Sequence, residues 1–317
     1  MKQAVPPKFS TSIARRRGSH TAANQPTRLR RFECRVVVCQ LRFVCMILVL
    51  LAARRTPECA ASDHVLIQPG ELPIVISAPH GGTGKLDGVP VRSGISVPSG
   101  PSGFVTVRDS STDLLALELS RRLEEEFGAR PWHVVSQVHR RYVDFNRSLE
   151  IAVEHPRARV VYDQYHDALK DACREIRATH QHGLLLDLHG QGTAPDTIFR
   201  GTRNGRTVAG LRKRFGDEAH HGPGSFFGLL QKSGWKVHPS PFDGKERSGY
   251  TGGYIVTTYG SHRPAGIDAI QLEFGSEYRL HGKHRETADK LTRVIADWVS
   301  SYLPELMPAT SSAVTDH

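Results

Sequence analysis

The sequence has little cysteine, and what it has is unevenly placed. Of the five cysteines in the 317-residue chain, only Cys173 lies beyond residue 62. One cysteine cannot form an intrachain disulfide, and a zinc site built on thiolates needs several. We therefore expect residues 63–317 to fold without either feature. Cys173 falls in a helical pattern and is expected to be a small buried hydrophobe rather than a nucleophile.

The same part of the chain lacks a net charge. The whole sequence carries +10, with 42 basic and 32 acidic residues, but residues 1–62 hold twelve Lys and Arg against two Glu. Residues 63–317 therefore contain 30 residues of each sign. Nucleic-acid binding usually requires a basic stripe or patch on the folded domain. Because the excess charge lies in a leader, no nucleic-acid partner is expected.

The sequence also has no apolar run that spans a bilayer comfortably. The run at 43–53 is about eleven residues long, whereas a membrane-spanning helix needs about twenty. Basic residues precede this run and small residues follow it, which is typical of a secretory signal. We expect an exported protein, periplasmic or secreted, or one anchored to the membrane through an uncleaved leader. An organellar transit peptide and a start site placed too far upstream remain alternatives. Residues 1–62 are excluded from the fold.

Residues 63–317 are expected to fold as one domain in which strands and helices alternate. A Gly-, Pro- and Ser-rich loop at 79–107 follows the first strand. Apolar runs and periodicity predict strands at 73–78, 132–137, 183–188, 235–238 and 267–274, and helices at 109–127, 158–180, 207–216, 224–233 and 284–302. This alternation favours a mostly parallel sheet covered by helices on both faces.

Two of the predicted strands end in a histidine followed by glycine. His80 follows the apolar run at 74–78, and His189 follows the run at 183–188. Side chains at the carboxyl ends of neighbouring parallel strands can meet, so both histidines are candidate metal ligands. Asp187 lies two residues before His189, on the same strand face, and could accept the ring N–H that the metal does not use. Histidines that merely hydrogen-bond a turn are the alternative.

Carboxylates at the start of the first helix can complete this set of ligands. Asp109 lies where the loop meets the predicted helix, and Asp113 lies four residues further on. Catalytic zinc usually takes three protein ligands and keeps one position for water. Asp109 is the preferred third ligand and Asp113 the reserve, although aspartate at a helix N-terminus is also an ordinary cap.

Polar residues that suit substrate binding and proton transfer follow two other strands. Asn146 and Arg147 end an Arg-rich segment at 140–147, and arginine can grip a carboxylate through two hydrogen bonds. Glu273 ends the last predicted strand, where a carboxylate beside bound water can act as the general base. A salt-bridged surface loop and a solvated edge glutamate are the alternative readings.

The order of these stretches resembles the N-formylglutamate amidohydrolase family, which is similar in fold and chemistry to the zinc carboxypeptidases and aspartoacylases. The matching stretches are P-H-G-G (79–82), R-D-S-S-T-D-L-L-A (108–116), R-Y-V-D-F-N-R (141–147), L-L-D-L-H-G (185–190) and Q-L-E-F (271–274). The resemblance implies a three-layer α/β/α sandwich with a mostly parallel mixed sheet, of the zinc-exopeptidase and phosphorylase-hydrolase type.

The resemblance also implies the roles of single residues. His80, Asp109 and His189 would bind Zn²⁺, Asn146 and Arg147 would contact the substrate, and Glu273 would be catalytic. Arg108 is a further candidate for substrate binding, and we expect Arg147, or else Arg108, to stabilise the oxyanion.

We therefore expect a zinc-dependent hydrolase that cleaves a C–N amide bond in a small molecule. The substrate would be an N-acyl amino acid, N-formyl compounds included, or a small peptide. The alternatives are a metallo-carboxypeptidase acting on peptides or cell-wall fragments, and a non-catalytic secreted binding protein that keeps the fold. A structural zinc site would need a fourth ligand, for which His139 and His166 are the candidates.

Overall fold

The structure is a computed structural model that describes residues 64–95, 98, 103–239 and 244–306. The predicted leader at 1–62 lies outside these residues, so export stays a prediction. None of the described helices combines the length and the apolar composition that a bilayer crossing requires.

Seven strands among the described residues form one mixed sheet, in the order β1-β3-β2-β4-β7-β5-β6. Their bounds are Val65–Gln68 (β1), Ile74–Ala78 (β2), Trp132–Ser136 (β3), Leu184–Gly190 (β4), Ile198–Gly201 (β5), Val237–His238 (β6) and Asp268–Phe274 (β7). The four central strands β3, β2, β4 and β7 are mutually parallel. Strand β1 runs antiparallel to β3, and β5 antiparallel to β7. The predicted mostly parallel mixed sheet is confirmed.

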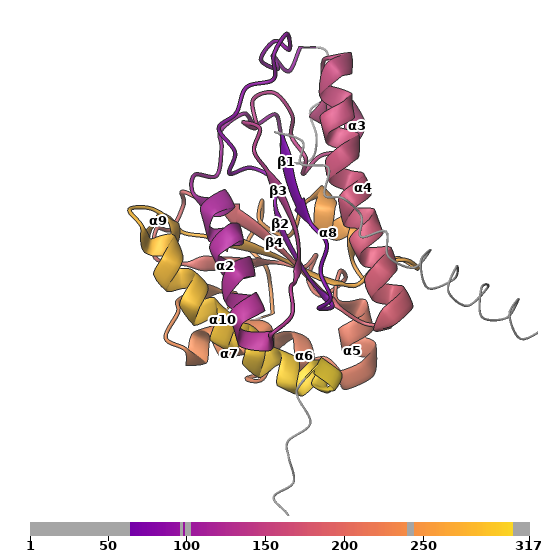
Figure 1. The fold of residues 1–317 in the computed structure, drawn as a ribbon. Coiled ribbons are helices and arrows are strands. Elements are labelled where there is room, and N and C mark those ends of the chain that lie inside the picture. The colour runs from indigo at the N-terminus through magenta and orange to yellow at the C-terminus, as the bar shows by residue number, and fades with distance from the viewer. Residues whose placement is uncertain (1–63, 96–97, 99–102, 240–243, 307–317) are drawn as a thin grey trace, which may run out of the picture. The chain divides into compact units, whose positions relative to one another are not determined.

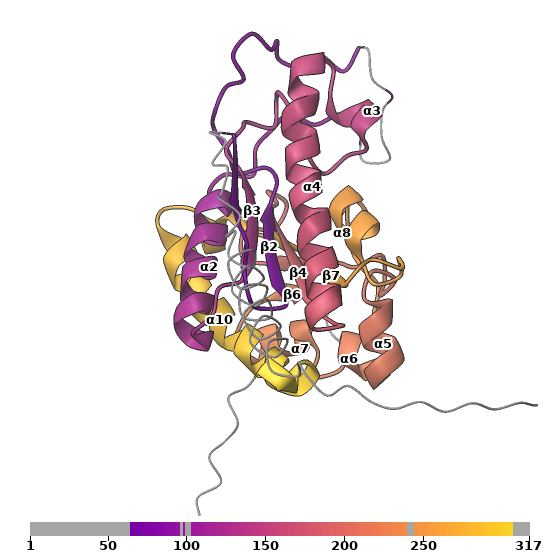
Figure 2. The same ribbon diagram turned by 45° about the vertical axis from the view of Figure 1, so that its right-hand side comes forward.

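Helices cover both faces of this sheet, which makes the predicted three layers (Figures 1 and 2). One face carries α2 (Thr112–Phe127), α7 (Phe226–Lys232) and α10 (Lys283–Tyr302), and the other carries α4 (Pro156–Thr179) and α8 (Tyr254–Tyr259). The remaining helical segments are short: α3 (Leu149–Ala152), α5 (Ala209–Phe215), α6 (Glu218–His221), α9 (Ser276–Arg279) and the 3₁₀ turn Pro304–Leu306.

The central strands are apolar along their length because both of their faces are buried. In β2, Ile74 and Ile76 pack in the cluster that includes α2 and α10, whereas Val75 packs in the cluster that includes α4. Alternate side chains therefore supply two cores, one on each side of the sheet. Cys173 belongs to the α4 side and is buried, as expected. Burial raises the pKa of its thiol to about 12, which suits a packing role.

The structure corrects the sequence prediction at several short elements. Strands β1 and β5 and helix α8 were not predicted, because four to six residues carry too little periodicity to be recognised. The first long helix was predicted from residue 109 but begins at Thr112. Ser111 has a left-handed backbone with φ of 66°, so the helix cannot extend back through it. Asp109 therefore lies in the preceding loop.

Candidate metal centre

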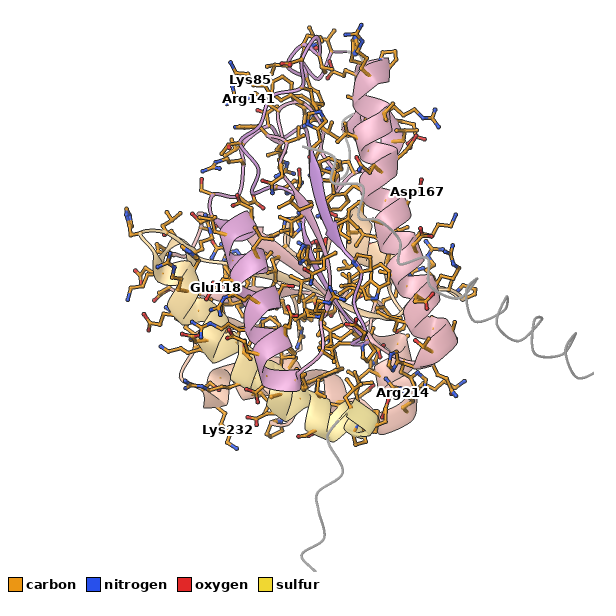
Figure 3. The ribbon with its side chains drawn as sticks, in the orientation of Figure 1. Lys85, Glu118, Arg141, Asp167, Arg214 and Lys232 are labelled. Atoms are coloured by element: carbon orange, nitrogen blue, oxygen red, sulfur yellow. The ribbon has the colours of Figure 1, made fainter. Side chains whose placement is uncertain are left out.

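The predicted site residues gather at the carboxyl ends of the central strands. His80 lies two residues beyond β2, and His189 lies near the end of β4. Glu273 on β7 is the register partner of His189. Because parallel strands end at one edge of a sheet, residues from three separate parts of the chain meet there. This end carries Lys85 and Arg141, which are labelled at the top of Figure 3, and Arg214 lies at the opposite end.

Three of these side chains form a compact group that could hold a metal ion. One ligating atom from each of His80, Asp109 and His189 lies within 4.8 Å of the others, and all three residues are buried. Asp109 Oδ2 is 3.0 Å from Nδ1 of His189 and 3.4 Å from Nδ1 of His80. The backbone N–H of Asp109 also donates to the carbonyl of His80, so the loop before α2 is fixed against the end of β2.

The second ring nitrogen of each histidine is bound to a carboxylate. Nε2 of His189 lies 2.9 Å from Oδ2 of Asp187, and Nε2 of His80 lies 2.8 Å from Oδ1 of Asp144. In each case Nε2 faces a carboxylate and Nδ1 faces Asp109. Burial would lower the pKa of His189, but the charge of Asp187 and the hydrogen bonds to Asp109 and Asp187 raise it well above its ordinary value, so both ring N–H groups of His189 donate to carboxylates. A bound metal ion would replace the proton on Nδ1. Carboxylates behind metal-bound histidines commonly fix the tautomer and the ring orientation in this way. The structure therefore brings Asp187 to the predicted place and adds Asp144, which the sequence analysis missed.

Asp144 is itself held by several donors. Arg140 donates to its Oδ2 from Nε at 2.9 Å and from Nη2 at 2.8 Å, and the backbone N–H of Asn146 donates to its Oδ1 at 3.1 Å. Burial alone would raise the pKa of this carboxyl, but the charge of Arg140 and the contact with His80 hold it well below its ordinary value. Asp144 is therefore an anion that can orient His80.

The donor atoms fit a zinc ion. Nδ1 of His80 is buried and has no hydrogen-bond partner among the described residues, although it points at Asp109. Burial would raise the pKa of Asp109, but its hydrogen bond to His189 and the neighbouring ring of His80 hold it well below the ordinary value, so this oxygen is anionic. Two imidazole nitrogens and one carboxylate oxygen are a common ligand set for catalytic zinc.

The other candidate ligands lie outside this group. Asp113, the reserve, packs against Gly81, where an added Cβ would come within 2.3 Å of the Asp113 backbone nitrogen. His166 binds the Tyr259 hydroxyl and a backbone carbonyl through its two ring nitrogens. His139 lies 3.0 Å from a guanidinium nitrogen of Arg141. No fourth protein ligand for a structural zinc site is present among the described residues.

Glu273 is placed beside the three ligands in a position suited to proton transfer. Its side chain is buried, and its Oε1 accepts a 2.7 Å hydrogen bond from Nε2 of Gln271. Burial raises the pKa of Glu273 to about 7, against the opposing charge of His189. A carboxyl group with such a pKa can both accept and return a proton near neutral pH. Gln271 was not predicted to orient this residue.

The group opens into a cavity of about 500 Å³ that is rich in arginine. The four arginines that line it are Arg108, Arg140, Arg147 and Arg279. Arg140 is bound to Asp144, and Arg279 donates to the backbone carbonyls of Phe274, Ser110 and Gln191. Arg147 donates one Nη1 hydrogen bond to the carbonyl of Asn146, and its buried Nε has no partner among the described residues. Arg108 donates from Nη1 to the carbonyl of Gly81. Of these four arginines, Arg147 has a buried guanidinium nitrogen without a partner among the described residues, which a ligand could use.

Asn146 also lines the cavity, but its amide is engaged by the protein. Its Oδ1 accepts from the backbone N–H of Ile255, and its Nδ2 lies 3.1 Å from Nε2 of His189 and 3.3 Å from Oε1 of Gln271. These contacts attach the first turn of α8, which follows the lining residues Gly252 and Gly253, to the metal group. The predicted contact of Asn146 with the substrate stays a prediction.

The comparisons with known proteins are structural. No protein-family model matches the sequence, and no curated protein matches it. The three-layer arrangement of sheet and helices is shared with a solved N-formylglutamate amidohydrolase. The chain superposes on the N-formylglutamate amidohydrolase from Ralstonia eutropha JMP134 with a TM-score of 0.50 and 17% identity, over 76% of this chain and 99% of that one. The predicted fold is confirmed by this similarity.

Two further solved structures are more distant. A succinylglutamate desuccinylase from Chromobacterium violaceum has a TM-score of 0.38 and 14% identity, over 73% of this chain and 63% of that one. An N-acetylmuramyl-L-alanine amidase from Mycobacterium smegmatis has a TM-score of 0.33 and 14% identity, over 72% of this chain and 97% of that one.

Proposed function

We propose that this protein is a zinc-dependent hydrolase that cleaves a C–N amide bond of an N-acyl amino acid or a small peptide. The observation that carries this proposal is the group of His80, Asp109 and His189 with converging ligand atoms beside the buried Glu273. Such a combination of two histidines, a carboxylate and a separate glutamate supports metal-assisted hydrolysis. The leader supports the further proposal that the enzyme acts outside the cytoplasm, in the periplasm or as a secreted protein.

The residues divide the reaction between them. His80, Asp109 and His189 would hold the ion, which when bound lowers the pKa of water and polarises a carbonyl group. Because Oε1 of Glu273 accepts from Gln271, its Oε2 is the oxygen that takes the proton from the attacking water. Glu273 then gives this proton to the leaving nitrogen, which its pKa of about 7 permits.

The arginines of the cavity support an anionic substrate. Arg147 has a buried Nε free of partners among the described residues, and guanidinium groups bind carboxylates through charge-assisted hydrogen bonds. The solved structure that shares the fold is named for an N-acylated acidic amino acid. Glutamate and aspartate derivatives are therefore the first compounds to assay, followed by peptides, which the carboxypeptidase alternative would cleave.

The first test is the zinc content of the full-length chain and of two variants. We expect one zinc per chain in the wild type and a loss of zinc in His189→Ala. Glu273→Gln should keep its zinc and lose about 10²- to 10⁴-fold in turnover of N-formyl and N-acetyl amino acids or short peptides, because it removes the general base. The exposed Glu277 in α9 gives the matched control, Glu277→Gln, which should keep both zinc and activity.

Two results would contradict the proposal. If the wild-type protein takes up no zinc even after reconstitution, the proposed zinc-dependent hydrolase activity is wrong. Near-normal turnover by Glu273→Gln would show that another group is the base. Zinc binding without turnover of any compound in the panel would favour the non-catalytic binding protein.

A further inference from the structure

A second cavity adjoins the metal cavity. It has a volume of about 400 Å³ and shares Val107 and Arg108 with the first cavity as lining residues. Its other walls come from Val91 and Thr106 in the loop after β2, and from His139 and Arg141 in the turn after β3. The second cavity therefore continues the surface of the first, past Arg108 and away from the metal group.

Positive charge surrounds this second cavity. Arg108 and Arg141 line it, and Lys85 is attached to its edge because the neighbouring Gly84 exchanges backbone hydrogen bonds with Gln137 and His139. Figure 3 labels Lys85 and Arg141 at the same end of the molecule. The charges of Arg141 and Arg108 add to burial in lowering the pKa of His139, which agrees with a positive potential there.

These three cations have no acidic partner among the described residues, which they share with other surface cations such as Lys232, but they lie at one cavity. On the helices, Arg121 pairs with Glu118, Lys290 with Glu286, and Arg159 with Asp163. By contrast, Lys85, Arg108 and Arg141 form no ion pair with any carboxylate among the described residues. Their charge is therefore available to an anionic ligand, which gains most from cations that the protein has not already neutralised.

Apolar side chains flank the same cations. Val107 is 73% exposed and Val91 is 50% exposed. Exposed apolar groups beside a charged cavity suit a ligand that carries both aliphatic and anionic groups. A free inorganic anion would use only the arginines and the lysine.

We propose that the second cavity binds an acidic residue of a peptide whose amide bond lies in the metal cavity, so that the substrate class is acidic peptides. This inference rests on the proposed function, since it takes the metal cavity as the place where the peptide is cut. A carboxylate at Arg141 and Arg108 would hold the chain extended across both cavities, with its aliphatic carbons against Val107.

The test is the affinity of the full-length, zinc-loaded protein for fluorescein-labelled tetraglutamate, measured by fluorescence anisotropy. The same peptide with glutamine at every position is the neutral probe, and mass spectrometry after the titration checks that each probe is intact. Arg141→Gln is compared with Lys232→Gln, which removes the same charge from an exposed position at the opposite end of the molecule (Figure 3). Lys85→Gln provides a second variant at the cavity.

We expect tetraglutamate to bind more tightly than tetraglutamine, with an affinity that falls as salt is added. Arg141→Gln should weaken the binding of tetraglutamate about tenfold, which is the usual effect of losing one charge-assisted hydrogen bond. Lys85→Gln should weaken it less, and Lys232→Gln by no more than about twofold. Equal affinity for the two peptides, or equal effects of Arg141→Gln and Lys232→Gln, would overturn the proposal.

Zinc content and hydrolysis of N-acetylglutamate are measured on the same preparations, so that the two proposals can fail separately. Zinc binding and hydrolysis without a preference for tetraglutamate would overturn the proposed binding at the second cavity, and the proposed hydrolase activity would stand. If the protein binds tetraglutamate tightly and through Arg141 but holds no zinc and shows no turnover, binding at the second cavity is supported and the proposed catalytic function is wrong.

Discussion

The two strand ends that supply the histidines differ in how the imidazole ring is oriented. At the end of β4, His189 is oriented by Asp187, two residues earlier on the same strand. At the end of β2, His80 is oriented by Asp144, which lies 64 residues away in the loop after β3. Both carboxylates are almost fully buried, and both leave Nδ1 of their histidine facing Asp109.

The difference lies in what holds each carboxylate. Asp187 accepts a 2.8 Å hydrogen bond from the hydroxyl of Ser77 on the neighbouring strand β2, within the regular sheet. Asp144 instead receives two hydrogen bonds from the guanidinium of Arg140. The carboxylate behind His189 is therefore held by a neutral hydroxyl within the sheet, and the carboxylate behind His80 by a buried ion pair in a loop. A buried ion pair is sensitive to the loss of either partner.

The largest expected effect comes from removing either histidine. His80→Ala and His189→Ala should each lower zinc affinity more than about 100-fold and reduce hydrolysis to background, because even the carboxylates behind such ligands contribute 10- to 100-fold. Zinc titration with a competing chelator measures the affinity. If one variant kept the wild-type affinity for zinc, the histidine removed in it would not be a zinc ligand, and the comparison of the two strand ends would fail.

Changing the carboxylates should separate the two strand ends. Asp144→Asn and Asp187→Asn should both lower zinc affinity by about 10- to 100-fold. Asp144→Asn should in addition lower the free energy of unfolding of the zinc-free protein by about 3–5 kcal/mol, because Arg140 loses its buried counter-charge. Asp187→Asn should cost about 1–3 kcal/mol, because His189 keeps Asp109 as a second carboxylate partner. Urea unfolding measures both, and equal losses of stability would contradict the distinction.

Histidines that lack a carboxylate partner should behave differently with pH. Burial lowers the pKa of His133 and His166 to about 4 and that of His220 to about 3. Since the unfolded pKa is about 6.5, the unfolded chain binds these protons first. Stability is therefore complete above pH 6.5 and is lost as the pH falls toward 4.

His166 gives a specific form of this prediction. Between pH 7 and pH 5 each such histidine should contribute about 2 kcal/mol to the loss of unfolding free energy. His166→Gln should remove about that amount from the pH dependence measured by urea unfolding of the zinc-free protein. The exposed His281 supplies the control, His281→Gln, which should leave the slope unchanged. If His166→Gln does not alter the dependence of the unfolding free energy on pH, His166 is not a buried, neutral histidine in the folded protein.

The smallest effect is expected at Ser77. Ser77→Ala removes the hydrogen bond to Asp187 and should lower zinc affinity about threefold. Ser136 is a buried serine on β3 whose hydroxyl binds the nearby backbone of Val138 and no other group among the described residues, so Ser136→Ala is the matched control. Both variants should lose similar stability, and only Ser77→Ala should affect zinc. An equal effect on zinc would mean that Asp187 needs no support from β2.

The same difference explains how much of the site could be predicted from the sequence. Asp187 and His189 are two residues apart in a strand, so their common face follows from local geometry. Asp144 was visible in the segment 140–147, but its contact with His80 depends on the packing of distant segments. Arg279 was missed for the same reason, because the carbonyls that it binds belong to three different parts of the chain.

For the fold, the length of each strand or helix decided whether it could be predicted from the sequence. The central strands β2, β4 and β7 and the helices α4 and α10 carry long apolar runs or clear helical periodicity, and each was predicted within a few residues. The edge strand β1 and the short elements β5 and α8 carry only four to six residues each. Their structure is imposed by pairing and packing with the longer elements rather than by their own sequence.

Asp109 and His189 touch although 80 residues separate them, and His80 joins them from a third segment. Contacts at such separations form only after the intervening chain has been organised, here when β2 and β4 pair and α2 packs on the sheet. A zinc-sensitive dye added during refolding should therefore report the arrival of the complete native structure. The rate of zinc uptake would therefore measure the rate of the final step of folding.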